Sequence, residues 1–164
     1  MTLGVHFALS VADRKRLLAV TEPDALLALI SEDLEETYLA NNRWSFQLDK
    51  AWDALHRSLT DGRLLYATGP FPLAYAVLGG APLDVGDDYT ACLVEPAQVA
   101  KAAIALAKVT EPWLRKRYFA LDAKAYGPLT TEDFAYTWTS FKGLPAFFAR
   151  AAKAKRSVLF SVDC

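Results

Sequence analysis

The sequence predicts an α/β (or α+β) fold, with a small mixed β-sheet covered by about six helices in a single compact domain over residues 1–164. The length suits one domain, and a hydrophobic content of 53% supplies a substantial core. Short β-branched and aromatic runs at 5–9, 89–94 and 157–162 are typical of strands. The segments between them have helical apolar spacing and helix-capping residues, and no repeat or linker divides the chain.

The first third of the chain alternates short elements with clear start signals. After the strand at 5–9, Ser10 is a suitable N-cap for a helix over about 11–20. Thr21-Glu22-Pro23-Asp24 combines a hydroxyl cap, acids and an early proline, so it predicts a second helix. The four acids within 31–36 are typical of a solvated face or a loop, with a cation or basic-partner site as the alternative.

The most strongly patterned helix is predicted over residues 48–59. Its large apolar residues recur at helical spacing, at Leu48, Trp52, Leu55 and Leu59. Asp61-Gly62 ends the run, because glycine is a common residue just beyond a helix. This stripe predicts that Trp52 is mostly buried.

The second half continues with helices that begin at hydroxyl, acidic or proline residues. Residues 64–66 are either a strand or an ordered loop, and 71–78 is a short helix closed by Gly79-Gly80. Further helices start at Glu95-Pro96 and at Thr110-Glu111-Pro112. The last helical region is rich in aromatic residues, and Gly143 and Pro145 are expected to split it because proline removes a backbone donor.

Two runs of the sequence resemble a known family. These are Leu48-Asp49-Lys50-Ala51-Trp52 with the following Leu55-His56, and Leu78-Gly79-Gly80-Ala81-Pro82-Leu83. Together with the N-terminal strand and a hydrophobic C-terminal strand, their order is similar to that of the YfbM-like family of bacterial proteins of unknown function. The resemblance covers nearly the whole chain.

The resemblance implies an α/β fold with helices packed on a compact sheet, and it assigns no activity, cofactor or catalytic residue. The Gly143/Pro145 break and Asn41-Asn42-Arg43-Trp44 depart from the family pattern. Relatives are associated with bacterial toxin–immunity gene neighbourhoods, which implies an immunity-type role as one expectation.

Composition narrows the partner classes. The net charge is −1, so there is no electrostatic reason to expect a nucleic acid or an anionic membrane as partner. No apolar run approaches the ~18 residues of a membrane span, and no secretory signal is visible. With only Cys92 and Cys164 a disulfide framework is not expected, so we predict a cytoplasmic protein.

The candidate site is the margin of the central helix, formed by Asp49, Trp52, Asp53 and His56. A carboxylate beside a histidine can orient the ring and raise its pKa, which is the arrangement of a general base. The alternative is a structural histidine, buried and hydrogen-bonded at the edge of the core, and this interpretation is favoured because histidine is often partly buried.

Metal and cofactor sites are not predicted. His6 could complete a metal site with His56 and an aspartate, but no metal-binding spacing is present. Cys92 lies in a predicted strand, where a thiol usually behaves as a small hydrophobic group. Two functions therefore stay open: a non-catalytic binding module that engages another protein, or a hydrolase-like or small-molecule-binding protein with its site around His56.

Overall fold

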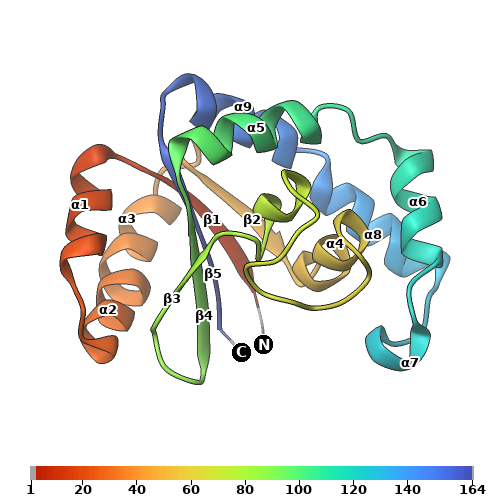
Figure 1. Ribbon diagram of the computed structural model, residues 1–164, viewed down its shortest axis with the longest axis horizontal. Helices are drawn as coiled ribbons and strands as arrows, with labels where there is room; N and C mark the ends of the chain where they lie inside the picture. Colours follow the sequence, from red (N-terminus) through yellow and green to blue (C-terminus); the bar gives the residue numbers. More distant parts are fainter. Residues whose placement is uncertain (1–2, 164) are drawn as a thin grey trace.

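The computed structural model describes residues 3–163, and its centre is a five-stranded sheet in the order β2-β1-β5-β4-β3 (Figure 1). The strands are β1 (Gly4–Leu9), β2 (Ser45–Asp49), β3 (Ala81–Leu83), β4 (Tyr89–Val94) and β5 (Ser157–Asp163). All three predicted strands are present, and Cys164 lies outside the described residues.

Every pair of neighbouring strands is antiparallel, where we expected a mixed sheet. The long helical connection from β4 to β5 explains the difference. Val94 ends β4 opposite Val158, near the start of β5, so the connection returns to the end of the sheet that it left. Two strands joined in this way run in opposite directions.

Strand β2 corrects the predicted helix over 48–59. The helix α4 is Trp52–Leu59, whereas Leu48 and Asp49 belong to the strand that pairs with β1. Leu48 is buried in the same core cluster as Leu55, so the apolar pattern continues through the turn although the backbone changes conformation. Asp49 has a φ of 53°, a left-handed conformation that aspartate adopts more readily than most residues.

One layer of helices covers one face of the sheet, on the left in Figure 1. It consists of α1 (Val11–Ala19), α2 (Pro23–Ala28), the π-helix η1 (Leu29–Leu34) and α3 (Glu35–Leu39). The acidic run at 31–36 is helical and not a loop. Glu32, Asp33 and Glu36 are exposed while Leu34 is buried, so the predicted solvated face is confirmed.

The second layer covers the opposite face. Its helices are short, so the chain has more helical segments than the six or so that we expected for the whole domain. It consists of α4, the 3₁₀ helix η2 (Leu73–Ala76), α5 (Pro96–Leu106), α6 (Glu111–Phe119), α7 (Ala123–Tyr126), α8 (Thr131–Phe141) and α9 (Leu144–Lys153). The predicted break at Gly143 and Pro145 separates α8 from α9. Residues 64–66 form a loop, and only the middle of 71–78 is helical.

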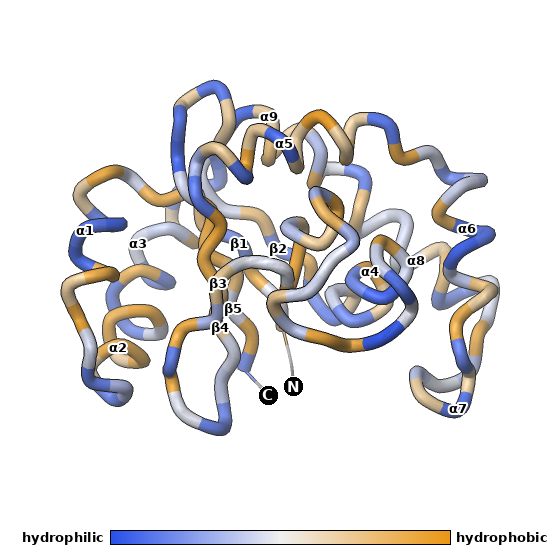
Figure 2. Tube along the Cα trace, viewed as in Figure 1, coloured by the Kyte–Doolittle hydropathy of each residue, from blue (hydrophilic) through white to orange (hydrophobic). Residues whose placement is uncertain are grey.

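The two layers are held by strand residues that alternate between the two faces of the sheet. Figure 2 shows hydrophobic residues along the central strands. In β1, Phe7 and Leu9 pack against the α1–α3 layer, while Ala8 points into the core beneath α4 to α9. In β5, Leu159 and Phe160 divide in the same way. Because successive strand side chains point to opposite faces, one short strand serves both cores.

Candidate functional site

His56 is a buried residue of α4 and its ring is hydrogen-bonded on both nitrogens. It is 1% exposed. Its Nε2 donates to the carbonyl oxygen of Leu65 at 2.9 Å, and its Nδ1 accepts from the amide of Leu78 at 3.4 Å. The carbonyl requires a protonated Nε2 and the amide an unprotonated Nδ1, so the geometry defines a neutral imidazole. This is the burial and backbone hydrogen bonding that the structural interpretation of His56 requires.

Neither of the two aspartates predicted to accompany His56 is hydrogen-bonded to its ring. Asp53 accepts from Nε of Arg57 at 2.6 Å, one helical turn along α4. Asp49 is exposed at the end of β2, where it lines a separate cleft with Glu35 and Asp163. Asp49 and His56 do not share a helical margin, because Asp49 is not part of the helix.

Trp52, the fourth predicted residue, is a core residue. It is 7% exposed and its ring lies 6.2 Å from that of Phe160 on β5. The predicted burial of Trp52 is therefore confirmed, and its side chain fills the core at the start of α4.

His6 and Cys92 also bind backbone groups of the segment between α4 and β3. Nε2 of His6 donates to the carbonyl oxygen of Ala76 at 2.6 Å, and Sγ of Cys92 donates to that of Val77 at 3.1 Å. His56 binds Leu65 and Leu78, so these side chains together hold both ends of the segment, whose middle is partly exposed. Gly79 completes the anchor, because a Cβ at that position would overlap the backbone of Ala74.

Burial keeps these anchoring groups uncharged. Desolvation lowers the pKa of His6 to about 4, against a smaller opposing effect of its bond to Ala76. Desolvation also lowers the pKa of His56, although the bond to Leu65 and the charge of Asp53 raise it in part. The pKa of Cys92 is raised to about 12 by burial, so its thiol is not a nucleophile near neutral pH. None of the three is prepared for general-base or nucleophilic chemistry.

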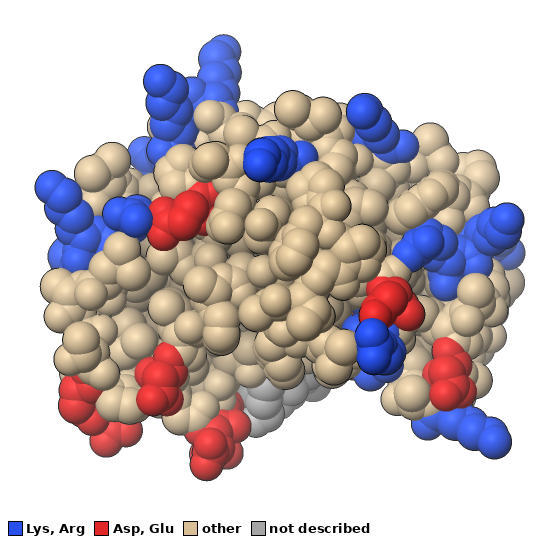
Figure 3. All heavy atoms as spheres, in the orientation of Figure 1, with Lys and Arg blue, Asp and Glu red and all other residues tan. Residues whose placement is uncertain are grey.

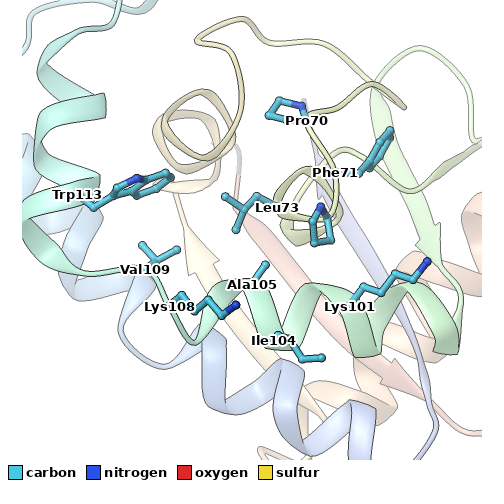
Figure 4. Close-up of a pocket in the computed structure, with 10 residues that line it drawn as sticks. Pro70, Phe71, Leu73, Lys101, Ile104, Ala105, Lys108, Val109 and Trp113 are labelled. Atoms are coloured by element: carbon cyan, nitrogen blue, oxygen red, sulfur yellow. The ribbon is translucent and has the colours of Figure 1, made fainter.

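The outer side of the same segment forms one wall of an apolar groove of about 430 Å³, which we call the α5 groove. Figure 4 shows Pro70, Phe71 and Leu73 on one side, the helix α5 on the other, and Trp113 at one end. Phe71 is 50% exposed, Ile104 of α5 is 63% exposed and Trp113 is 37% exposed. The volume is within the range of ligand-binding pockets in proteins.

The charge of the α5 groove has one sign. Its polar side chains are Lys101 and Lys108, and no carboxylate lines it. Both lysines are exposed, and neither forms an ion pair with any residue of 3–163. Figure 3 shows the surrounding face as a broad uncharged area with basic side chains along its upper edge. The groove therefore combines exposed apolar surface with free positive charge.

The α5 groove was not predicted, although Ile104 carried a signal. Val99 and Leu106 are the buried large residues of α5. At 100° per residue, Ile104 lies about 140° around the helix from Val99, on the side otherwise occupied by lysines. A single large aliphatic residue on a polar helix face is common on protein surfaces and becomes informative only when others gather beside it. Its pairing with Phe71, 33 positions away in the sequence, required the fold.

Among residues 3–163, no group of three or more His, Cys, Asp or Glu side chains is arranged to hold a metal ion. No helix in that part of the chain combines the length and apolar character needed to cross a bilayer.

The fold and site define an α/β protein whose reactive side chains support its own backbone and whose open groove is apolar. The chain belongs to the family described as domain of unknown function (DUF1877), whose model matches residues 1–161. This agrees with the resemblance to YfbM-like proteins.

The crystal structure of a protein of unknown function, YfbM from Escherichia coli, has the same fold. It superposes with a TM-score of 0.67 at 22% identity, covering 98% of this chain and 99% of that one. At this identity the likeness concerns the fold alone. No curated protein matches the chain.

Proposed function

We propose that this chain is a non-catalytic binding module for another protein and that the α5 groove is its contact surface. The observation that carries the proposal is the gathering of exposed Phe71, Ile104 and Trp113 around one groove. Large apolar side chains grouped in this way usually mark a site of interaction, because each loses free energy by remaining in water. Aromatic residues are also enriched at the centres of protein interfaces.

The alternative, a hydrolase-like or small-molecule site around His56, has less support. A general base must reach the proton that it removes. His56 is 1% exposed and both ring nitrogens already have backbone partners. The α5 groove contains no hydroxyl, thiol or carboxylate that could act in its place.

Within this proposal the protein is of the immunity or adaptor type and acts in the bacterial cytoplasm. Such proteins work by occupying a surface of their partner, which needs an exposed contact face and no reactive group. The buried, unpaired thiol of Cys92 fits a reducing compartment. A nucleic acid is a poor partner for this groove, since its positive charge is limited to two lysines and the chain as a whole has a net charge of −1.

A displayed library of random peptides tests the proposal. We expect the parent chain to select peptides whose synthetic forms bind it in fluorescence anisotropy and lose at least tenfold in affinity for Ile104→Glu. Val11→Glu is the matched control, because Val11 is 68% exposed on α1, in the layer across the sheet from the groove. Selected peptides that bind Ile104→Glu and Val11→Glu equally well would contradict the proposal.

A further inference from the structure

We infer that the α5 groove receives an amphipathic helix of the partner protein, with two acidic residues about two turns apart, one at each end of the apolar patch that enters the groove. This inference rests on the proposed function and specifies the chemistry of the partner. It follows from the positions of Lys101 and Lys108 and from the hydrogen bonding of the groove walls.

The two lysines frame the apolar surface of α5. Lys101 lies in the helix, Lys108 is the second residue after its end, and Ile104 and Ala105 lie between them (Figure 4). Seven residues of helix correspond to about 10 Å along the axis. The two lysine positions are therefore about 10 Å apart along the groove, so a partner that pairs with both needs two separate carboxylates with apolar side chains between them. A single fatty-acid carboxylate could pair with only one lysine.

The groove walls offer little backbone hydrogen bonding to an extended peptide. On one side the amides and carbonyls of α5 are used within the helix. On the other side Pro70 and Pro72 have no N–H, and their carbonyl oxygens accept from Ala74 at 3.0 Å and from Tyr75 at 3.1 Å. Addition of a strand requires a row of free backbone groups, whereas a helix satisfies its own backbone and binds through side chains.

A helix that packs along α5 meets both requirements. Residues seven apart on the partner repeat the spacing of Lys101 and Lys108, so acids at positions i and i+7 face the two lysines. Apolar residues at i+3 and i+4 then enter the groove between Phe71 and Ile104. Because no acidic side chain lines the groove, a basic helix would meet uncompensated repulsion there.

The test is a displayed library of helical peptides in which the flanking positions vary among acidic, neutral and basic residues. It is selected in parallel on the parent chain and on a Lys101→Glu/Lys108→Glu variant whose folding is verified by thermal melting. We expect the parent to enrich acids seven positions apart and the variant to enrich basic residues there. The best parent-selected peptide, made synthetically, should lose at least tenfold in affinity for the variant and bind the parent more weakly as salt increases.

The outcomes separate this inference from the proposed function. Two results would overturn the acidic helix and still leave the groove as a binding surface. In the first, the enriched peptides depend on Ile104 but show no preference for acidic residues. In the second, the same acidic preference is enriched on the Lys101→Glu/Lys108→Glu variant. Enrichment of extended, proline-rich sequences from the random-peptide library would also overturn the helical partner. Peptide binding that Lys108→Ala leaves unchanged would contradict the two-lysine pairing. If the chain self-associates and Ile104→Glu abolishes this association, the occupant of the groove would be a second copy of the chain and not an acidic helix.

Discussion

The inner and outer sides of the segment between α4 and β3 are made from different residues and serve different purposes. On the inner side, His6, His56 and Cys92 bind backbone groups of the segment and are buried. On the outer side, Phe71 projects toward solvent beside Ile104 of α5.

This contrast is the opposite of what these residue types usually indicate in a sequence. The histidines and the thiol, which suggest chemistry in a sequence, satisfy buried carbonyls that would otherwise destabilise the fold. The phenylalanine and isoleucine, which suggest a core, are exposed. In this protein the polar groups support the structure and the apolar groups form the candidate site.

The largest expected effect compares two tryptophans, one in the core and one at the groove. Trp52→Ala should lower the free energy of unfolding by about 3–5 kcal/mol, because a large buried ring is removed from a packed core. Trp113→Ala should lower it by about 1 kcal/mol or less, since Trp113 is 37% exposed. Urea denaturation of both variants measures the difference, and equal losses would break the distinction between the two sides.

The next effect is the pH dependence that His6 imposes. Its pKa is about 4 in the folded protein and 6.5 for an unperturbed histidine, so the unfolded chain binds the proton more readily. Stability from this residue is fully present above pH 6.5 and is lost as pH falls toward 4, by about 1.4 kcal/mol per unit and about 3 kcal/mol in total.

Urea denaturation across this pH range should show a shallower slope for His6→Leu than for the parent. Leucine is apolar, as the surrounding Phe147, Phe148 and Phe160 require, but it cannot take up a proton. In this variant the carbonyl oxygen of Ala76 loses its hydrogen bond, which should lower the free energy of unfolding by the same amount at every pH. This loss therefore does not alter the slope of stability against pH. An unchanged slope would mean that His6 does not contribute the expected proton linkage.

A smaller effect is expected at His56. His56→Gln should lower the free energy of unfolding by about 1–2 kcal/mol. The glutamine side chain can still donate a hydrogen bond to the carbonyl oxygen of Leu65, but in the same geometry it cannot also accept one from the backbone N–H of Leu78. Ring-proton NMR should show that His56 in the parent titrates below its usual range, in keeping with the lowered pKa. A ring that titrates freely, together with an unchanged melting temperature for His56→Gln, would restore the catalytic interpretation.

The smallest effect on stability is expected at the groove itself. Ile104→Glu should change the free energy of unfolding by no more than about 0.5 kcal/mol, because the residue is 63% exposed on a helix that tolerates glutamate. The same variant should lose peptide binding. Thermal denaturation and anisotropy of one preparation measure both, and a large loss of stability would place Ile104 among the structural residues.

Local sequence signals predicted the elements whose form depends on near neighbours. The strands at 5–9, 89–94 and 157–162 followed from short β-branched and aromatic runs. The split at Gly143 followed from proline chemistry, and Ser10 caps α1 by accepting from the amide of Asp13 as expected. The cap and the split depend on backbone sterics and on hydrogen bonds within one turn, and the strands were recognised from their local β propensity, although that propensity does not say which strands pair.

The tertiary structure decided which distant groups meet. Leu48 has the spacing of a helix residue, but pairing of its segment with β1 makes it part of a strand. His56 finds Leu65 and Leu78 instead of Asp53, because a buried backbone group must have a partner and the fold brings those two within reach. The α5 groove likewise exists only where Phe71 and Ile104 are brought together across the molecule. Pairings of this kind are set by packing and hydrogen-bond satisfaction over the whole chain, and no local pattern records them.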